Sequence, residues 1–285
     1  MMSYQCFNLD IQNSIAHLRL NRPDAMNTMQ PVFFRELSTI LSELQQSGKA
    51  RVLVLSSTGK HFCAGMSLDV FTSGGFRIDD STAAGRASLA MVVQDMHRCI
   101  NQLEELRMPV IAAIQGGCIG GGVDLICATD IRLGSSDSFF CIQEINIGMT
   151  ADLGTLQRLP KLIPEGIVHE MAYTGRRLAA QRAQQCGLLN EVFETQEQML
   201  AAAMEMAAEI AAKPPVAIWG SKQAIHYARD HATHDALQQM AWLQAGIWQS
   251  SNLMEAFMAK QQKRPTNFPD LPPLQYFADS DYPLK

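Results

Sequence analysis

The sequence lacks an apolar run approaching the roughly 18 residues that mark a membrane-spanning helix, although 47% of its 285 residues are hydrophobic. Its N-terminus lacks the basic and then apolar stretches of a secretory signal peptide, and its last residues match no receptor-read address. We therefore expect a protein of the cytoplasm with no membrane partner. The apolar content suffices for one large core, with or without an appendage.

Positive charge is also scarce. The chain has 23 Lys and Arg residues against 28 Asp and Glu residues, which gives a net charge of −5. Because a nucleic-acid surface needs a basic patch to neutralise phosphates, this balance argues against DNA or RNA as a partner.

The cysteines lack the close pairing of a metal or redox motif. Their number is odd, no two are spaced as CxxC, and most lie in apolar runs. We expect buried free thiols in a reducing compartment, with neither disulfides nor a zinc site. The seven are Cys6, Cys63, Cys99, Cys118, Cys127, Cys141 and Cys186.

Glycine is concentrated in a stretch that fits none of the common nucleotide motifs. Five of the seven residues from 116 to 122 are glycine, but the third glycine of a dinucleotide fingerprint that starts at Gly120 would fall on Leu125. No Gly-Lys-Ser or Gly-Lys-Thr follows for a P-loop, and HExxH is absent. The segment Gly65–Asp69 resembles a nucleophile elbow but lacks its final glycine. The glycines therefore need another explanation.

Hydrophobic periodicity indicates alternating strands and helices, which is typical of the α/β class. From about residue 164 the chain is expected to be mostly helical. Two further segments are predicted to be an exposed loop (72–84) and an extended, proline-rich tail (265–285). The main predicted strands are 15–20, 51–57, 111–114, 131–133 and 139–142, and the main predicted helices are 33–44, 89–103, 123–128, 199–210 and 237–260.

Two glycine segments, 64–66 and 120–122, each follow an apolar strand and lead into a helix. Such junctions present free N–H groups and the positive end of a helix dipole. If the two converge, their N–H groups can hold the negative oxygen of a transition state. The alternative is that the glycines only permit tight packing.

Three carboxylates follow, at Asp124, Glu144 and Asp152, each beside apolar residues. Apolar surroundings raise carboxyl pKa values toward neutrality, which suits proton transfer. Taken singly, Asp152 could instead be a helix N-cap, and Asp124 a partner of a helix dipole. Together with paired N–H donors, and with no nucleophile or metal site, the carboxylates point to enolate chemistry on a thioester.

These residues carry a resemblance to the enoyl-CoA hydratase/isomerase family, also called the crotonase family. The motifs, which occur in the family's order, are Asn21-Arg22-Pro23, Phe62-Cys63-Ala64-Gly65-Met66, 109–114, 120–124 and 179–188. Within the family, segments 116–125, 151–161 and 228–231 are most similar to the branch that isomerises dienoyl-CoA thioesters.

The resemblance implies a fold and a set of site residues. The fold would be a spiral of ββα turns with a C-terminal helical trimerisation region, assembled as a homotrimer or a dimer of trimers. The backbone N–H groups of Met66 and Gly121 would form the oxyanion hole. Contacts to the acyl-CoA substrate would come from Ala64, Gly65, Met66, Gly120 and Gly121.

The resemblance also implies the reaction, a shift of 3,5-dienoyl-CoA to 2,4-dienoyl-CoA. Glu144 and Asp152 would exchange protons with C2 and C6, in an order left open, and Asp124 would be an auxiliary charge. No cofactor or metal is expected, since coenzyme A is part of the substrate. The alternatives are an enoyl-CoA hydratase and, from another class, an RNA- or acyl-CoA-binding relative.

We expect three parts along the chain. Residues 1–195 would form the spiral core with the active site, residues 196–262 the helical region, and residues 263–285 an extended C-terminal tail.

Overall fold

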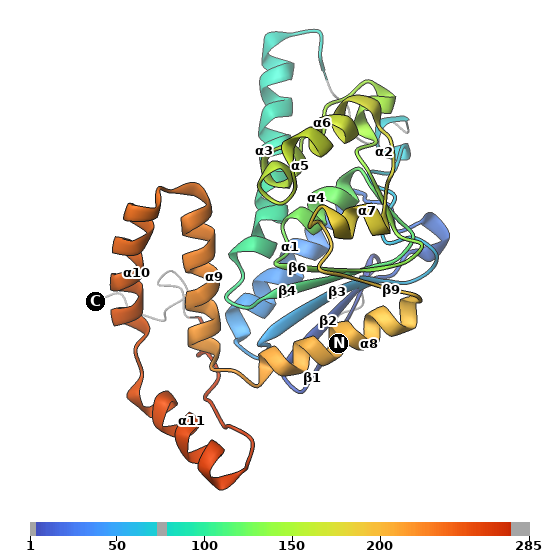
Figure 1. Ribbon diagram of the computed structural model, residues 1–285. Helices are drawn as coiled ribbons and strands as arrows, with labels where there is room; N and C mark the ends of the chain where they lie inside the picture. The colour runs from blue at the N-terminus through green and yellow to red at the C-terminus, as the bar shows by residue number, and fades with distance from the viewer. Residues whose placement is uncertain (1–3, 73–78, 275–285) are drawn as a thin grey trace, which may run out of the picture.

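A six-stranded sheet forms the centre of the computed structural model, which describes residues 4–72 and 79–274 (Figure 1). Its order is β1-β2-β3-β4-β6-β9; β1 and β2 are antiparallel and the remaining pairs are parallel. The strands are β1 (Phe7–Gln12), β2 (Ile15–Leu20), β3 (Val52–Ser57), β4 (Val110–Ile114), β6 (Ile131–Ser135) and β9 (Glu191–Phe193). A second, three-stranded sheet contains β5 (Gly117–Ile119), β7 (Phe139–Cys141) and β8 (Leu178–Ala179).

Helices cover both faces of the larger sheet, so its central strands are apolar on both sides. Val52 and Val54 of β3 pack with α8 (Gln196–Ala211) on one face. Leu53 and Leu55 belong to the main core on the other face, with α1 (Pro31–Ser47) and α3 (Ala83–Glu105). Figure 1 shows α8 on the opposite side of the sheet from α1. The predicted α/β class is confirmed.

The remaining helices surround the second sheet and form the C-terminal part. They are α2 (Asp69–Thr72), α4 (Gly121–Cys127), α5 (Thr155–Arg158), α6 (Glu165–Thr174), α7 (Ala180–Gln185), α9 (Pro215–Asp230), α10 (Thr233–Ile247) and α11 (Ser250–Gln262). Short 3-10 helices occupy Pro23–Ala25, Glu144–Ile147 and Leu159–Lys161. No helix in the two described ranges is long and apolar enough to cross a membrane.

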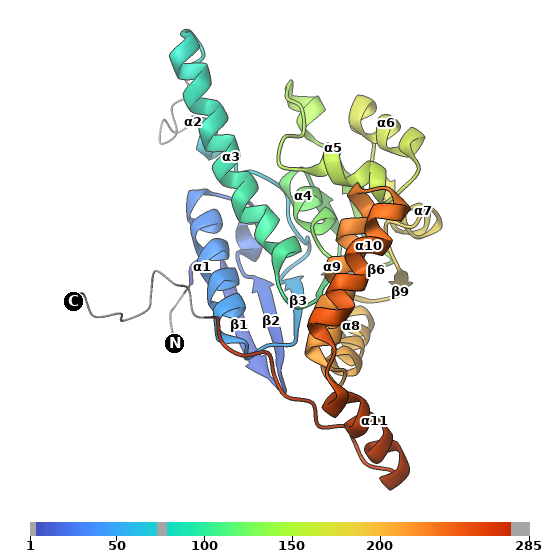
Figure 2. The same cartoon turned by 90° about the vertical axis from the view of Figure 1, so that its left-hand side faces the viewer.

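The single helix predicted over 237–260 is wrong, because the chain forms α10 and α11 there. Trp248 has ψ 121° and Gln249 has ψ 106°, so the backbone is extended between the two helices. A side chain at Gly220 of α9 would come within 2.4 Å of Ile247, which shows how closely the end of α10 approaches α9. Beyond this contact the chain turns away, and Figure 2 shows α11 extending from the paired α9 and α10.

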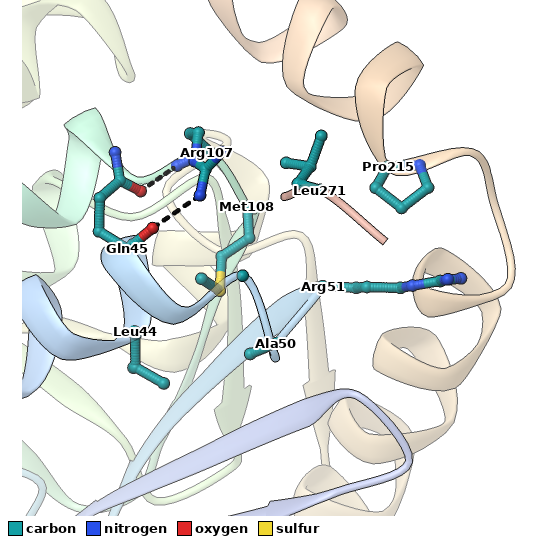
Figure 3. Close-up of a pocket in the computed structure, with 9 residues that line it drawn as sticks. Leu44, Gln45, Ala50, Arg51, Arg107, Met108, Pro215 and Leu271 are labelled. Atoms are coloured by element: carbon teal, nitrogen blue, oxygen red, sulfur yellow. Dashed lines mark hydrogen bonds between the residues drawn. The ribbon is translucent and has the colours of Figure 1, made fainter. Parts of the chain in front are cut away.

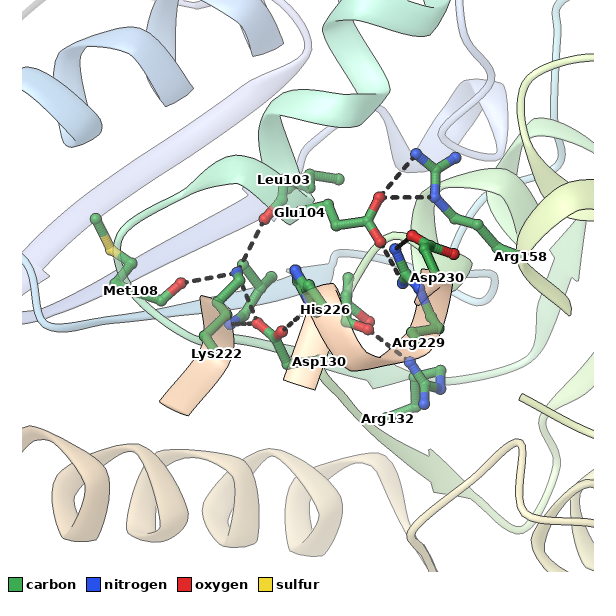
Figure 4. A network of polar contacts seen from close by, with 12 residues as sticks. Leu103, Glu104, Met108, Asp130, Arg132, Arg158, Lys222, His226, Arg229 and Asp230 are labelled. Atoms are coloured by element: carbon green, nitrogen blue, oxygen red, sulfur yellow. Dashed lines mark hydrogen bonds and ion pairs between the residues drawn. The ribbon is translucent and has the colours of Figure 1, made fainter. Parts of the chain in front are cut away.

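A buried lysine anchors α9 to the core. Lys222 is 5% exposed, and its Nζ donates to the carbonyl oxygens of Leu103 and Met108 and to Asp130 Oδ2 at 2.9 Å. His226, one turn further along α9, lies 3.4 Å from Asp130 Oδ1. Figure 4 shows this cluster. The domain boundaries expected at 195 and 262 stay a prediction, although this contact fixes the helical region to the core.

Substitution of Lys222 by Met should destabilise the protein. The aliphatic stem keeps its packing, but Asp130 loses its buried cation, and breaking such a pair costs about 3 kcal/mol or more. We expect the low end, because His226 and the Val110 N–H still contact Asp130. Urea unfolding measures the loss. Arg98→Met is the control, since its pair with Asp95 is exposed and should contribute at most about 1 kcal/mol. Equal losses in the two variants would contradict the assignment.

The chain after α11 returns to the start of the parallel strands. Arg51 Nη2 donates to the carbonyl of Phe268 at 2.6 Å, and the N–H of Leu274 donates to Gln46 O at 2.8 Å. The tail thus lies along the protein as far as Leu274. Residues 275–285 lie outside the described residues, as do residues 73–78 of the predicted loop 72–84. A small pocket forms beneath the tail (Figure 3), lined by Leu44, Gln45, Gly48, Ala50, Arg51, Arg107, Met108, Pro215 and Leu271.

Candidate active site

The candidate site lies at the opposite end of the sheet from that pocket. The pocket adjoins the residues that precede β3 and β4, whereas the two glycine segments follow the carboxyl ends of these strands. Ligands of parallel α/β sheets bind outside the carboxyl ends of the strands. The strand order therefore places both candidate N–H donors at the edge where a substrate is expected.

Backbone pairing brings the two glycine segments together. The N–H of Cys63 donates to Gly117 O at 3.1 Å, and the N–H of Ile119 donates to Cys63 O at 2.9 Å. On its other side, the first segment is fixed by a hydrogen bond from the Met29 N–H to Gly65 O at 2.8 Å. The first glycine segment is thus held between Met29 and β5.

The two proposed oxyanion donors lie next to each other. Gly65 has φ +81°, and a β-carbon there would lie 3.4 Å from the backbone nitrogen of Gly121. Gly121 opens α4, where the first N–H groups have no partner within the helix. Among the hydrogen bonds between described residues, none uses the N–H of Met66 or of Gly121. Both groups are free to hold an oxygen.

Glu144 lies directly over this glycine turn. The N–H of Gly120 donates to Cys141 O at 2.9 Å, which ties the turn to the end of β7. A β-carbon at Gly120 would lie 2.9 Å from Glu144 Oε1, so only glycine leaves room for the carboxylate. Glu144 lies outside the predicted strand 139–142, which is β7 in the structure. It opens a 3-10 helix three residues after β7, and this turn directs it toward Gly120.

The Glu144 carboxyl group has a pKa suited to proton transfer. Burial raises its pKa to about 7, and the negative charges of Asp124 and Asp152 add to this effect. A hydrogen bond from its own backbone N–H acts in the opposite direction. Its Oε2 is buried and, among the described residues, has no hydrogen-bond partner. A carboxyl group with a free oxygen and a near-neutral pKa can both accept and donate a proton.

Asp124 is almost fully buried on α4, at 1% exposure. Its Oδ1 accepts two hydrogen bonds from Thr155, one from the backbone N–H at 2.6 Å and one from the hydroxyl at 2.7 Å. Burial raises its pKa to about 6, while these two bonds act in the opposite direction. The predicted position of Asp124 at a helix start is confirmed.

Asp152 is half-buried in the segment before α5. Burial raises its pKa, while its own backbone N–H and His97 act to lower it. His97 of α3 lies with Nε2 2.5 Å from the carbonyl oxygen of Asp152. The N-cap of α5 is Gly154, so the helix-cap alternative for Asp152 does not hold.

The structure therefore brings Met66, Gly121 and Glu144 together, and Asp124 and Asp152 act on Glu144 through their charges. The roles of these five residues, and the substrate contacts of Ala64, Gly65 and Gly120, stay predictions. Sequence reasoning missed two polar residues, Thr155 and His97. Their partners lie 31 and 55 residues away in the chain, so no local pattern could have revealed the contacts.

A sheet with free N–H donors and carboxylates at its carboxyl edge fits the enzymes that act on acyl-CoA thioesters through an enolate. The family model described as enoyl-CoA hydratase/isomerase matches residues 10–270. The chain therefore belongs to the enoyl-CoA hydratase/isomerase family, and the predicted crotonase-like fold is confirmed. The solved enoyl-CoA hydratase of Bacillus anthracis superposes with a TM-score of 0.83 at 29% identity, covering 93% of this chain and 99% of that one.

Curated relatives within the family carry a more particular name. The chain is 38% identical over 260 residues to the mitochondrial Delta(3,5)-Delta(2,4)-dienoyl-CoA isomerase of Mus musculus, covering 90% of this chain and 79% of the relative. It is 37% identical to the peroxisomal Delta(3,5)-Delta(2,4)-dienoyl-CoA isomerase of Arabidopsis thaliana over 276 residues, which cover 95% and 99% of the two chains.

Proposed function

We propose that this protein isomerises 3,5-dienoyl-CoA to 2,4-dienoyl-CoA. The observation that carries the proposal is Glu144, which lies against the glycine turn that holds the Gly121 donor. The charges of Asp124 and Asp152 help raise its pKa to about 7, and among the described residues its Oε2 has no hydrogen-bond partner. The relatives' names support the same reaction.

The reaction removes a proton from C2 of the acyl chain and adds a proton at C6. The thioester oxygen accepts hydrogen bonds from the N–H groups of Met66 and Gly121, which stabilise the dienolate that forms when C2 loses a proton. One of Glu144 and Asp152 takes that proton, and the other delivers a proton to C6. The double bonds shift from 3,5 to 2,4, and the dienolate returns to a neutral thioester.

The same chemistry explains the other expectations for ligands. No electrons leave or enter the substrate, so the reaction needs no redox cofactor, and coenzyme A remains attached throughout. The segment from Ala64 to Met66 and the turn at Gly120 and Gly121 would hold the thioester end of the acyl-CoA. The net charge of −5 disfavours the RNA-binding alternative.

The environment of Asp124 separates this proposal from the hydratase alternative. By resemblance, a hydratase has glutamates at positions 124 and 144 to hold the water that it adds. Here the shorter Asp124 already accepts two hydrogen bonds from Thr155 on one oxygen. One oxygen of this carboxylate is therefore already occupied by the protein, which disfavours a role in orienting a water molecule.

A paired-substrate assay tests the proposal. The purified protein is offered a 3,5-dienoyl-CoA and a 2-enoyl-CoA of equal chain length, and products are followed by absorbance and mass. We expect turnover of the dienoyl substrate and little hydration of the enoyl substrate. Turnover of the enoyl substrate alone would establish the hydratase instead. Salt-dependent RNA binding with no turnover of either thioester would favour the binding-protein alternative.

We also propose that the protein assembles as a homotrimer or a dimer of trimers through its C-terminal helices. α10 has no buried residue, and Trp242 and Trp248 are 81% and 60% exposed. Leu253, Met254 and Phe257 extend this apolar surface onto α11. Light scattering measures the mass, and a monomer would contradict the proposal.

The cytoplasm remains our prediction for the compartment of this protein. Because relatives are named mitochondrial or peroxisomal, cell fractionation is the necessary test.

A further inference from the structure

Thr155 donates two hydrogen bonds to the Asp124 carboxylate, one from its backbone N–H and one from its hydroxyl. Both donors converge on the same atom, Oδ1, at 2.6 and 2.7 Å. Thr155 and Asp124 are each 1% exposed. A buried carboxylate keeps its charge only when hydrogen bonds or cations replace the water it has lost, so Thr155 takes the place of solvent for Asp124.

The short helix that begins at Thr155 is fixed at its other end by ion pairs. Arg158, its last residue, donates to Glu104 Oε2 of α3 through Nε at 3.1 Å and Nη2 at 3.0 Å. Arg229 of α9 donates to the other oxygen of Glu104 at 2.5 Å. Figure 4 shows this chain of Arg158, Glu104 and Arg229. Thr155 therefore has little freedom to move away from Asp124.

We propose that Thr155 is a positioning residue for the reaction, which keeps the Asp124 carboxylate ionised and correctly placed beside Glu144 and Asp152. The inference rests on the proposed function for its catalytic consequence. The contact itself, however, can be tested without any turnover.

The charges that face Asp124 determine the consequence. The carboxylates are Glu144 and Asp152, the cation is Arg158, and the neighbouring thiols Cys63, Cys118 and Cys127 are held neutral because burial raises their pKa values. Ionised Asp124 helps raise the pKa of Glu144. Without the Thr155 hydroxyl, burial of Asp124 would be less opposed and its pKa would rise. Asp124 would then be neutral near pH 7, and the pKa of Glu144 would fall.

The test compares Thr155→Val, which removes only the hydroxyl, with Thr155→Ser, which keeps it. In the pH profile of kcat/KM for 3,5-dienoyl-CoA, we expect the limb near pH 7 to move to lower pH by about one unit in the Val variant, equivalent to a tenfold change in proton affinity. Thr155→Ser should restore the limb. Thr129→Val is the matched control, because among the described residues this buried hydroxyl bonds to Ile126 O of α4 and to no other group.

A second readout does not depend on activity. Carbon-13 NMR of labelled aspartate follows the titration of Asp124, whose signal is assigned by its loss in Asp124→Asn. We expect the Asp124 midpoint to rise in Thr155→Val and to stay unchanged in Thr129→Val. An unchanged midpoint in a folded Val variant overturns the proposal, whatever the substrate. A Val variant that is slow at every pH, with its limb unmoved and no rescue by Ser, also overturns it, because only a structural role would remain. If the midpoint rises while wild-type protein fails to turn over 3,5-dienoyl-CoA, the positioning contact stands and the proposed reaction is wrong.

Discussion

Replacement of Glu144 by Gln is expected to lower kcat for 3,5-dienoyl-CoA by about 10²–10⁴-fold, the range that a positioned acid or base contributes. Glutamine has the same size but cannot carry a proton between carbon atoms. Asp152→Asn should have an effect of the same order, because the proposed reaction needs one group to take a proton and another to deliver one. Neither amide removes the N–H donors of Met66 and Gly121, so substrate affinity should persist.

Steady-state kinetics and calorimetric binding of an unreactive acyl-CoA separate these effects. The wild-type profile of kcat/KM should change near pH 7, where the Glu144 carboxyl titrates, and this limb should be absent from Glu144→Gln. Glu165→Gln is the control, because its side chain is 75% exposed on α6. Wild-type rates in Glu144→Gln or Asp152→Asn would rule out the proton-transfer roles.

The second large effect is expected at Gly65. In Gly65→Ala the new β-carbon would lie 3.0 Å from Ile119 O and 3.4 Å from the Gly121 nitrogen, at a backbone φ of +81°. At least one of these two neighbours must shift. The two oxyanion donors would then no longer point to one oxygen. Loss of one such donor lowers kcat by about 10²–10³-fold.

A second glycine separates this effect from backbone strain. Gly187→Ala places alanine at φ +89°, and the nearest atom to its β-carbon would be Leu162 O at 3.8 Å. Gly187 lies outside the residues of the candidate site. Both variants should lose stability, by roughly 1 kcal/mol or more, but only Gly65→Ala should lose turnover. Equal activity in the two variants, measured below their unfolding temperatures, would mean that the geometry at Gly65 does not matter for the reaction.

Most of the sheet and the first helix could be predicted from local pattern. The predicted strands at 15–20 and 111–114 are β2 and β4, and the predicted helical face from Phe33 to Leu44 is the buried face of α1. The first strand, 7–12, was missed although Phe7 and Leu9 carry alternating apolar character. The break between α10 and α11 contains no proline, and the nearest glycine, Gly246, lies inside the last turn of α10. Ile247, the last residue of α10, packs closely against Gly220 of α9, a contact between separate helices that no local pattern shows.

The candidate site could be predicted as a set of residues but not as an arrangement. The glycine stretch predicts an N–H donor at Gly121, and the apolar surroundings of Glu144 predict a carboxyl group suited to proton transfer. Their closeness depends on the pairing of Cys63 with Gly117 and of Gly120 with Cys141, which are contacts between distant segments. The same limit hid Thr155, whose role is visible only from its bonds to Asp124.

Deuterium labelling distinguishes two separate carboxyl groups, one for the proton lost from C2 and one for the proton gained at C6, from a single group that handles both. A single turnover of 3,5-dienoyl-CoA is run in D₂O, and the 2,4-dienoyl-CoA product is examined by NMR and mass spectrometry. The acid that protonates C6 exchanges with solvent before the substrate binds, so we predict one deuterium at C6. Product that carries only the original C2 hydrogen at C6 would show that a single residue transfers it, and would rule out separate roles for Glu144 and Asp152.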